Sequence, residues 1–510
     1  MINYTPQNQL SLEGFTHPFD RDLLPDNRWV KLAKVIPWDE LAAVYAKNLQ
    51  TGSGRKSVDI RLVIGALIVK HKLGLDDRGT IAMIQENIYI QYFCGMKSFT
   101  TKAAFDPSLF VDIRKRLGAD EFDKFNKLII EKAEQLKPRH ARIKVKNSGT
   151  DKNEDEPKQG DLPNKGTLKA DATIADQEIK FPTDINLLSI GRENLERMID
   201  LLYDAKHDKK KPRDYRRKAR QAYLNISKKR RKSKKVIRKG IKAQLQFVAR
   251  DLRIIKELMK QREERSHKLS QRDKVLLETI TKMYEQQKWM YDNHKNSIPD
   301  RIVNIFQPWV RPMVRGKDKN KTEFGAKVDV SEVNGFCRVD RFSWDAFNEG
   351  GDVELLVENY HKLYGRYPET FLGDGIYMNR KARAFLKEKG IKIYGKPLGR
   401  PPKIPKETAT QKYRKRKKAA ERNHIEGKFG QGKRGYGLNN VKARLKDTSE
   451  SWINAIFFVM NLQKLLQIAE KAPGFFVLFL EIYRNTEIYL KNYFLRKYFT
   501  PKVQIELCAA

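Results

Sequence analysis

The segment TLKADATIADQEIKFPTD, residues 167–184, marks the change from a polar stretch to a region with the character of a packed sheet. Small and β-branched side chains dominate its first half, and such side chains favour strands. Pro182, near its end, cannot donate a hydrogen bond to a neighbouring strand. We predict two strands here, over about 167–174 and 177–182.

The elements predicted after this segment alternate between helices and strands. Residues 190–297 have helical periodicity and a dense run of Lys and Arg. Strand signals return at 302–345, where Asn334 and Gly335 indicate a hairpin turn. The order is then helix, strand, helix, strand, loop and a last helix around 414–429. This order is typical of an α/β domain that carries a helical insertion.

Before this segment we predict an irregular arm, a helical region and a linker. Residues 1–54 show strand or turn signals, whereas residues 55–137 are helical, with Gly74 ending the first long helix. Two helices joined by a short turn fit a helix-turn-helix DNA-binding unit or an ordinary helical bundle, and the pattern leaves both open. Residues 138–166 have the composition of a polar linker. For residues 471–510 we predict a C-terminal helical segment.

The composition indicates a polyanionic partner. Lys and Arg number 103 against 63 Asp and Glu, which gives a formal net charge of +40. A chain this basic gains free energy by releasing the counterions of nucleic-acid phosphates. A membrane-surface protein is disfavoured because no long basic helix has a clean apolar face, whereas a ribosome-associated protein stays open. We expect no membrane partner, since no apolar stretch reaches roughly 18 residues.

Cysteine positions and short motifs indicate the cellular compartment of the protein and the cofactors it would use. Cys94, Cys337 and Cys508 are too far apart for a CxxC metal site or a disulfide framework, so we expect a cytoplasmic protein. The N-terminus lacks the basic-then-apolar form of a secretory signal. The sequence has no Walker A motif, and we expect no nucleotide cofactor.

Three acidic residues occupy positions suited to phosphodiester chemistry. Such chemistry uses carboxylates that converge on a pair of hard cations about 3.5–4 Å apart. Asp171 lies inside the strand KADATI, where a charge is costly unless it is paired or bound to metal. Asp374, in FLGDGIY, follows a strand at the end where open α/β sheets place ligands. Glu426, in RNHIEGKFGQGKRGYGL, lies on a predicted helix.

Each acid also has an ordinary structural interpretation. Alternation along a strand would let Asp171 face solvent, and an Asp between glycines, such as Asp374, is common in turns. Glu426 and Arg422 are four residues apart and could form a surface ion pair. Lys433 shares the face of Glu426 only if the helix continues through several glycines, and we interpret that glycine-rich stretch as a loop.

Together these segments resemble the DDE transposases of bacterial insertion sequences, in the insertion-sequence-five group. Asp171, with its downstream Pro-Thr-Asp, resembles the first catalytic acid of that family. Asp374, with a following Tyr and a basic helix start, resembles the second. Glu426 resembles the third, within the family's Tyr–Arg–Glu–Lys signature.

The signature is matched in three of its four positions. Three residues lie between Arg422 and Glu426, and six lie between Glu426 and Lys433. The signature's Tyr would fall at position 419, where this chain has Ala419. The similarity spans roughly residues 55–470.

The resemblance implies a ribonuclease-H-like mixed sheet as the catalytic core, over 167–470, with a basic helical insertion at about 190–297. It places the first two acids on adjacent central strands and the Glu on a later helix. It also implies that the helices of 55–137 form an all-helical DNA-binding domain.

The implied activity is cleavage at transposon ends followed by transfer of the new 3′-OH into target DNA. The three acids would hold two Mg²⁺ ions, with Mn²⁺ able to substitute. Arg422 and Lys433 would contact DNA phosphates, with Arg315, Asn379 and Arg380 as further contacts or solvated surface residues. The implied partner is double-stranded DNA bound by a homodimer, and the implied location is the nucleoid. A related nuclease without strand transfer, or a non-catalytic DNA-binding protein derived from a transposase, are the alternatives.

Overall fold

A computed structural model describes residues 3–6, 22–49, 56–137, 163–206, 208, 210–261, 268–314, 322–394 and 408–472. Most of the predicted linker, most of the predicted C-terminal segment and Arg315 lie outside these residues.

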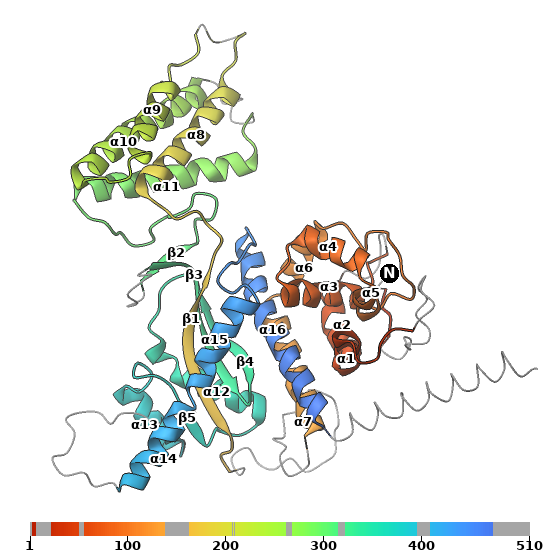
Figure 1. Ribbon diagram of the computed structural model, residues 1–510. Coiled ribbons are helices and arrows are strands. Elements are labelled where there is room, and N and C mark those ends of the chain that lie inside the picture. The colour runs from red at the N-terminus through yellow and green to blue at the C-terminus, as the bar shows by residue number, and fades with distance from the viewer. Residues whose placement is uncertain are drawn as a thin grey trace, which may run out of the picture.

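A six-stranded mixed sheet lies at the centre of the molecule (Figure 1). Strand β1 (Thr167–Asp176) pairs antiparallel with β3 (Thr322–Val333) and parallel with β5 (Thr370–Leu372). Strand β6 (Lys392–Ile393) extends the parallel side. Strands β2 (Arg311–Val314) and β4 (Phe336–Ser343) both pair antiparallel with β3, on the edge of β3 that does not pair with β1.

Strand β1 corrects the first prediction, because one long strand replaces the predicted two. Its ladder with β3 runs without a break from Lys169 to Asp176. The Asp176 N–H donates to the Leu438 carbonyl at 3.1 Å, and the Val441 N–H donates to the Asp176 carbonyl at 2.8 Å. These partners are more than 250 residues away along the chain, so a local pattern cannot reveal them.

The predicted hairpin between β3 and β4 is confirmed. Val333 pairs with Phe336, and only Asn334 and Gly335 lie between them. Both have positive φ, 54° and 92°, which a two-residue hairpin turn requires and which Asn and Gly adopt at low cost.

Helices surround the sheet, and those after β4 are α12 (Val353–Tyr364), α13 (Arg380–Glu388), α14 (Ala409–Ala420), α15 (Asn423–Gly435) and α16 (Lys446–Lys471). Helix α16 is buried along most of its length and packs against α7 and β4. None of the described helices combines the length and the hydropathy that crossing a membrane demands.

The described residues before the sheet form the helices α1 (Arg28–Val35), α2 (Trp38–Ala46), α3 (Ile60–Leu73), α4 (Asp77–Glu86), α5 (Ile88–Phe93), α6 (Leu109–Arg116) and α7 (Ala119–Leu136). Helices α1 and α2 correct the prediction that this part of the chain is irregular. They are short, and Pro37 separates them, so neither gives a long periodic pattern. Their buried side chains, Trp29 and Trp38 among them, belong to the same hydrophobic core as the sheet.

A buried lysine marks the contact between these N-terminal helices and α16. The Lys70 side chain is fully buried, and its Nζ lies 2.7 Å from Asp77 Oδ1 and 4.3 Å from the ring centroid of Trp452. Burial lowers the pKa of Lys70 to about 8, against the opposing charge of Asp77. The ion pair and the aromatic ring therefore compensate a cation that water does not reach.

The insertion after β1 forms a helical bundle of its own, seen at the top of Figure 1. It contains α8 (Asp184–Leu202), α9 (Arg216–Ser227), α10 (Lys234–Gln261) and α11 (Gln271–Asp292). A second hydrophobic cluster, separate from the core of the sheet, holds it together. The insertion therefore begins a few residues earlier than the predicted position of about 190.

A buried carboxyl inside this bundle gives a prediction about pH. Asp251 is fully buried, and its Oδ2 has no hydrogen-bond partner among the described residues. Burial raises the pKa of Asp251 to about 7, and the charges of Glu196 and Asp214 add to the rise while Arg250 opposes it. The folded protein therefore keeps a proton that the unfolded chain loses near pH 4, so this group lowers stability as pH rises from about 4 to about 7.

We expect Asp251→Asn to remove that dependence. The stability of the variant relative to the parent should rise by on the order of 2–4 kcal/mol between pH 4 and pH 7 and then level off. Urea unfolding of both proteins at several pH values measures the difference. A difference that stays constant over this range would contradict the prediction.

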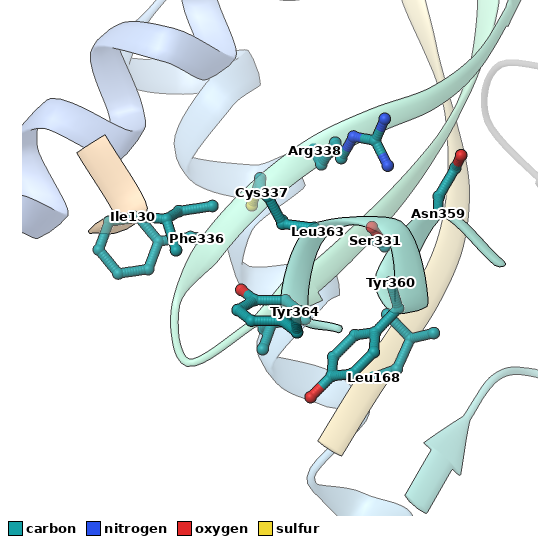
Figure 2. Close-up of a pocket in the computed structure, with 11 residues that line it drawn as sticks. Ile130, Leu168, Ser331, Phe336, Cys337, Arg338, Asn359, Tyr360, Leu363 and Tyr364 are labelled. Carbon is teal, nitrogen blue, oxygen red and sulfur yellow. The ribbon is translucent and has the colours of Figure 1, made fainter. Parts of the chain in front are cut away.

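Two hollows lie on the α12 side of the sheet, and neither contains the predicted acids. Figure 2 shows the smaller, a cavity of about 20 Å³ that Leu168, Phe336 and Tyr360 help to line. It has room for about one water molecule. A polar hollow of about 580 Å³ lies between α7, β4, α12 and α16, with Asp123 and Glu450 in its wall.

Candidate active site

Asp171 lies in the middle of β1, on the face of the sheet against which α15 packs. Alternation along the strand puts Lys169, Asp171 and Thr173 on this face. Asp171 Oδ1 accepts a hydrogen bond of 2.9 Å from the Ala172 N–H, and Asp171 is half-buried.

Asp374 lies just beyond the end of β5, beside Asp171. Lys169 of β1 is opposite Leu372 of β5 in the parallel ladder. Each acid comes two residues after its member of this pair, so Asp374 follows the end of β5 beside the part of β1 that contains Asp171. Asp374 Oδ1 accepts a hydrogen bond of 2.9 Å from the Ile376 N–H, which fixes the turn that follows.

Glu426 lies in the first turn of α15, and Arg422 precedes that helix as its N-cap. Arg422 Nη2 lies 2.7 Å from Glu426 Oε1, and its Nη1 lies 3.7 Å from Asp171 Oδ2. The guanidinium therefore stands between the first and third acids. The surface ion pair expected at four-residue spacing is present, and it reaches the strand as well.

Helix α15 corrects two predictions about this region. The predicted single helix around 414–429 is two helices, because the chain turns at Glu421 and Arg422. The predicted glycine-rich loop is helical through Gly435. Gly432 explains why: a Cβ there would lie 3.3 Å from Leu438 and 3.4 Å from Met460, so the glycine permits a close approach to α16 that offsets its low helix propensity.

Because α15 continues, Lys433 shares the side of the helix that carries Glu426. Lys433 Nζ lies 3.5 Å from Glu323 Oε1 at the start of β3. The cation is thus placed along the same face, seven residues from the acid.

The three acids interact electrostatically. The pKa of Asp171 is raised to about 6, mainly by burial and in addition by the negative charges of Asp374 and Glu426. The Ala172 N–H and the Arg422 guanidinium act in the opposite direction. A further cation at this place would therefore be stabilised by the carboxylates and would favour ionised Asp171.

The donor chemistry of these residues fits a hard divalent cation, since carboxylate oxygens are the ligands that Mg²⁺ prefers. The side-chain arrangement is not yet that of a metal site, because the described His, Cys, Asp and Glu residues form no group of three able to hold an ion. Glu426 is exposed and Arg422 occupies the space between two acids. Rotation of these two side chains is what metal binding would require.

Asp329 and Tyr377 position the turn that carries Asp374, and the sequence did not single them out. Asp329 is fully buried in β3, and the Tyr377 hydroxyl donates to its Oδ1 at 2.6 Å. Burial raises the pKa of Asp329 to about 8. An Asp within the alternating pattern of FGAKVDVSEV looks like an outward-facing residue, so its burial could not be read from the pattern.

The remaining predicted phosphate contacts fall in different places. Asn379 is the N-cap of α13, where its Oδ1 accepts from the Ala382 N–H, and its Nδ2 donates to the Gly350 carbonyl at 2.7 Å. Its amide therefore has a structural function. Arg380 is exposed at the first position of α13. Arg315 lies outside the described residues.

Comparison with known proteins matches two separate segments to transposase families. Residues 371–463 match a family described as "Transposase DDE domain", and this segment includes Asp374 and Glu426. Residues 18–116 match "Transposase domain (DUF772)". Asp171 lies outside both segments.

One relative and the solved structures complete the comparison. "Uncharacterized protein ORF8 in nfe locus" of Rhizobium meliloti is 31% identical over 121 residues, which are 24% of this chain and 58% of that protein. The chain thus matches little more than half the length of this relative. No solved structure matches. The two family matches, one over the N-terminal helices and one over two of the three acids, support a DDE transposase.

Proposed function

We propose that the protein is a DNA transposase of the DDE type and that Asp171, Asp374 and Glu426 are its catalytic, metal-binding acids. The observation that carries the proposal is the placement of these residues. Asp171 lies in β1, Asp374 follows the adjacent parallel strand β5 by two residues, and Arg422 links Asp171 to Glu426. The family match over 371–463 supports the same assignment for the second and third acids.

We also propose that the mixed sheet is the ribonuclease-H-like core expected of this family. Support comes from Asp171 in β1, from Asp374 just after the neighbouring strand β5, and from the later helix α15, which carries the Glu. We place the chain in the insertion-sequence-five group, with Ala419 in place of the signature's Tyr.

The chemistry would use two Mg²⁺ ions, or Mn²⁺, to activate the attacking oxygen and stabilise the leaving one. In the first step, water attacks the phosphorus at the transposon end and the P–O3′ bond breaks, which leaves a 3′-OH and a 5′-phosphate. In the second, that 3′-OH attacks a phosphorus of target DNA, and the target's own P–O3′ bond breaks. The first step hydrolyses one phosphodiester, the second exchanges one phosphodiester for another, and neither needs an oxidant or a nucleotide.

The cations around the acids would hold the DNA. Arg422 lies 2.7 Å from Glu426 and 3.7 Å from Asp171 in this structure, and it would turn to a phosphate when metal takes its place. Lys433, on the same side of α15, would contact a neighbouring phosphate. Arg380, exposed beside the turn of Asp374, is a further candidate.

We propose three further parts for this function. The N-terminal helices would bind transposon-end DNA, consistent with the match to a transposase domain over 18–116. The basic insertion would contact phosphates, since residues 228–232 are five consecutive exposed cations. A homodimer on DNA would pair the two ends, and the nucleoid would be its location.

The test is metal-dependent cleavage of a plasmid that carries the reading frame with its natural flanking DNA. We expect nicks at a defined position with Mg²⁺ or Mn²⁺, none with EDTA, and joining of the freed 3′-OH to a second plasmid. Cleavage without joining would favour a related nuclease. Binding with no cleavage under any metal would reject the proposal in favour of a non-catalytic DNA-binding protein.

A further inference from the structure

Helix α14 has no side that is buried by the other residues that the structure describes. Its sequence is ATQKYRKRKKAA, and none of its 12 residues is buried. Six of them are cationic and none is acidic, and these six, called here the α14 cations, are Lys412, Arg414, Lys415, Arg416, Lys417 and Lys418. At 100° per residue they leave no side of the helix without a positive charge. A helix of this kind lacks an apolar face, so packing onto the core does not explain its presence.

The ends of α14 are nevertheless well defined. Thr408 and Gln411 form a capping box that starts the helix, in which the Gln411 N–H donates to Thr408 Oγ1 at 3.2 Å. Only Glu421 and Arg422 separate α14 from α15. The helix is thus a built element attached directly to the residue that contacts Asp171 and Glu426.

Its position suits DNA that runs from the proposed catalytic acids. Figure 1 places α14 at the end of the molecule opposite the helical insertion. Twelve helical residues span about 18 Å, which is the length of about five base pairs. The major groove is about 12 Å wide and admits an α-helix between two phosphate backbones. Charge on every side of the helix fits an environment with phosphates on both sides.

We propose that α14 lies in a groove of the duplex beside the cleavage position, with its cations on phosphates of both strands. The inference rests on the proposed function, because it takes DNA as the substrate. It adds that this helix, and not the basic insertion, holds the duplex within about six base pairs of the bond that is cut. Tyr413, which is 66% exposed among the cations, would lie against the same DNA.

The main test neutralises five of the α14 cations by substitution to Gln, a residue of similar helix propensity. These substitutions are Lys412→Gln, Arg414→Gln, Lys415→Gln, Arg416→Gln and Lys417→Gln. Lys418 stays because its Nζ is 2.7 Å from Glu421 Oε2. The matched control changes the five exposed cations of 228–232 to Gln, so both variants lose the same charge. Neither set includes a residue of the catalytic site.

The readouts are the salt dependence of binding to a duplex that spans the cleavage position, and a hydroxyl-radical footprint. In the α14 variant, we expect the magnitude of the slope of log K against log salt to fall by about 3 to 4. We also expect the variant to lose protection of the DNA within about six base pairs of the cut. The control should keep that local protection. The inference would be overturned if both variants showed equal changes in slope and kept the footprint. The α14 cations would then attract DNA only through their net charge and would not contact it near the cut.

A second measurement does not depend on the multiple substitution. A photoreactive p-benzoylphenylalanine at Tyr413 should cross-link to the duplex near the cut, whereas the same group at Trp289, an exposed residue of α11, should not. No cross-link at position 413 would overturn the inference. The inference would also be overturned if the α14 variant lost binding to duplex RNA but kept binding to duplex DNA. That result would show that the helix binds RNA.

Failure of the proposed function is a separate outcome. A parent protein that binds the duplex and never cuts it would refute the transposase proposal, while the slope and the cross-link at position 413 would still report on α14. A parent that cuts at a defined position while the α14 variant keeps its slope and footprint would refute only the inference about α14.

Discussion

Asp374→Asn is expected to abolish DNA cleavage while DNA binding remains. Asn keeps the shape of the side chain and can still accept from the Ile376 N–H, so the turn should persist. The variant loses the negative charge with which a metal ligand stabilises the transition state. That stabilisation is worth several kcal/mol, so the cleavage rate should fall by about a thousandfold or more. Single-turnover cleavage with Mg²⁺ and binding to the same duplex measure the two effects separately.

The control for this prediction is Asp292→Asn, which makes the same change in charge at an exposed residue of α11. Cleavage by this variant should equal that of the parent. A metal ligand is further distinguished from a structural residue by Asp374→Cys, since a softer thiolate ligand should be inactive with Mg²⁺ and partly active with Mn²⁺. Unchanged cutting by Asp374→Asn would remove Asp374 from the proposed site.

The sequence predicts local elements well where one short pattern determines them. Gly74 ends α3 with a φ of 66°, as expected of a helix C-cap. Asn334 and Gly335 make the expected hairpin turn. The strand before Asp374 and the helix after it are also where the pattern puts them, because apolar periodicity and caps act over a few residues.

The sequence fails where distant parts of the chain decide the structure. Helix α15 continues through Gly432 because α16 and Leu438 pack against it. Strand β1 continues to Asp176 because β3 and the segment after α15 pair with it. The resemblance supplied the three acids, whereas the contact of Arg422 with Asp171 and the support of Tyr377 by Asp329 required the fold.

Asn461→Leu is expected to destabilise the protein severely, although the residue is far from the proposed acids along the chain. Asn461 is fully buried in α16 and makes three hydrogen bonds. Its Oδ1 accepts from the Cys337 N–H at 2.8 Å, and its Nδ2 donates to the Cys337 carbonyl at 2.7 Å and to Asn126 Oδ1 at 2.9 Å. One side chain thus joins α16 to strand β4 and to helix α7.

Leu has a similar volume but leaves three buried polar groups without a partner. Each such group costs about 1–3 kcal/mol, so the free energy of unfolding should fall by about 3–5 kcal/mol. That is a large part of the 5–15 kcal/mol typical of a folded protein. Urea unfolding measures the loss. Asn454→Leu in the same helix is the matched control, because the Asn454 amide donates to the Glu450 carbonyl of its own helix, and its loss should cost less than about 1 kcal/mol.

The comparison of the two Asn variants also bears on how DNA would be held. Helix α7 belongs to the N-terminal helices, and β4 belongs to the sheet that carries Asp171. If Asn461→Leu is destabilising and Asn454→Leu is not, the N-terminal helices and the sheet unfold as one unit, and DNA bound by the first would have a fixed position relative to the acids on the second. Equal stabilities of the two variants would show that α7 and β4 do not depend on this contact, and the N-terminal helices could then move independently of the site.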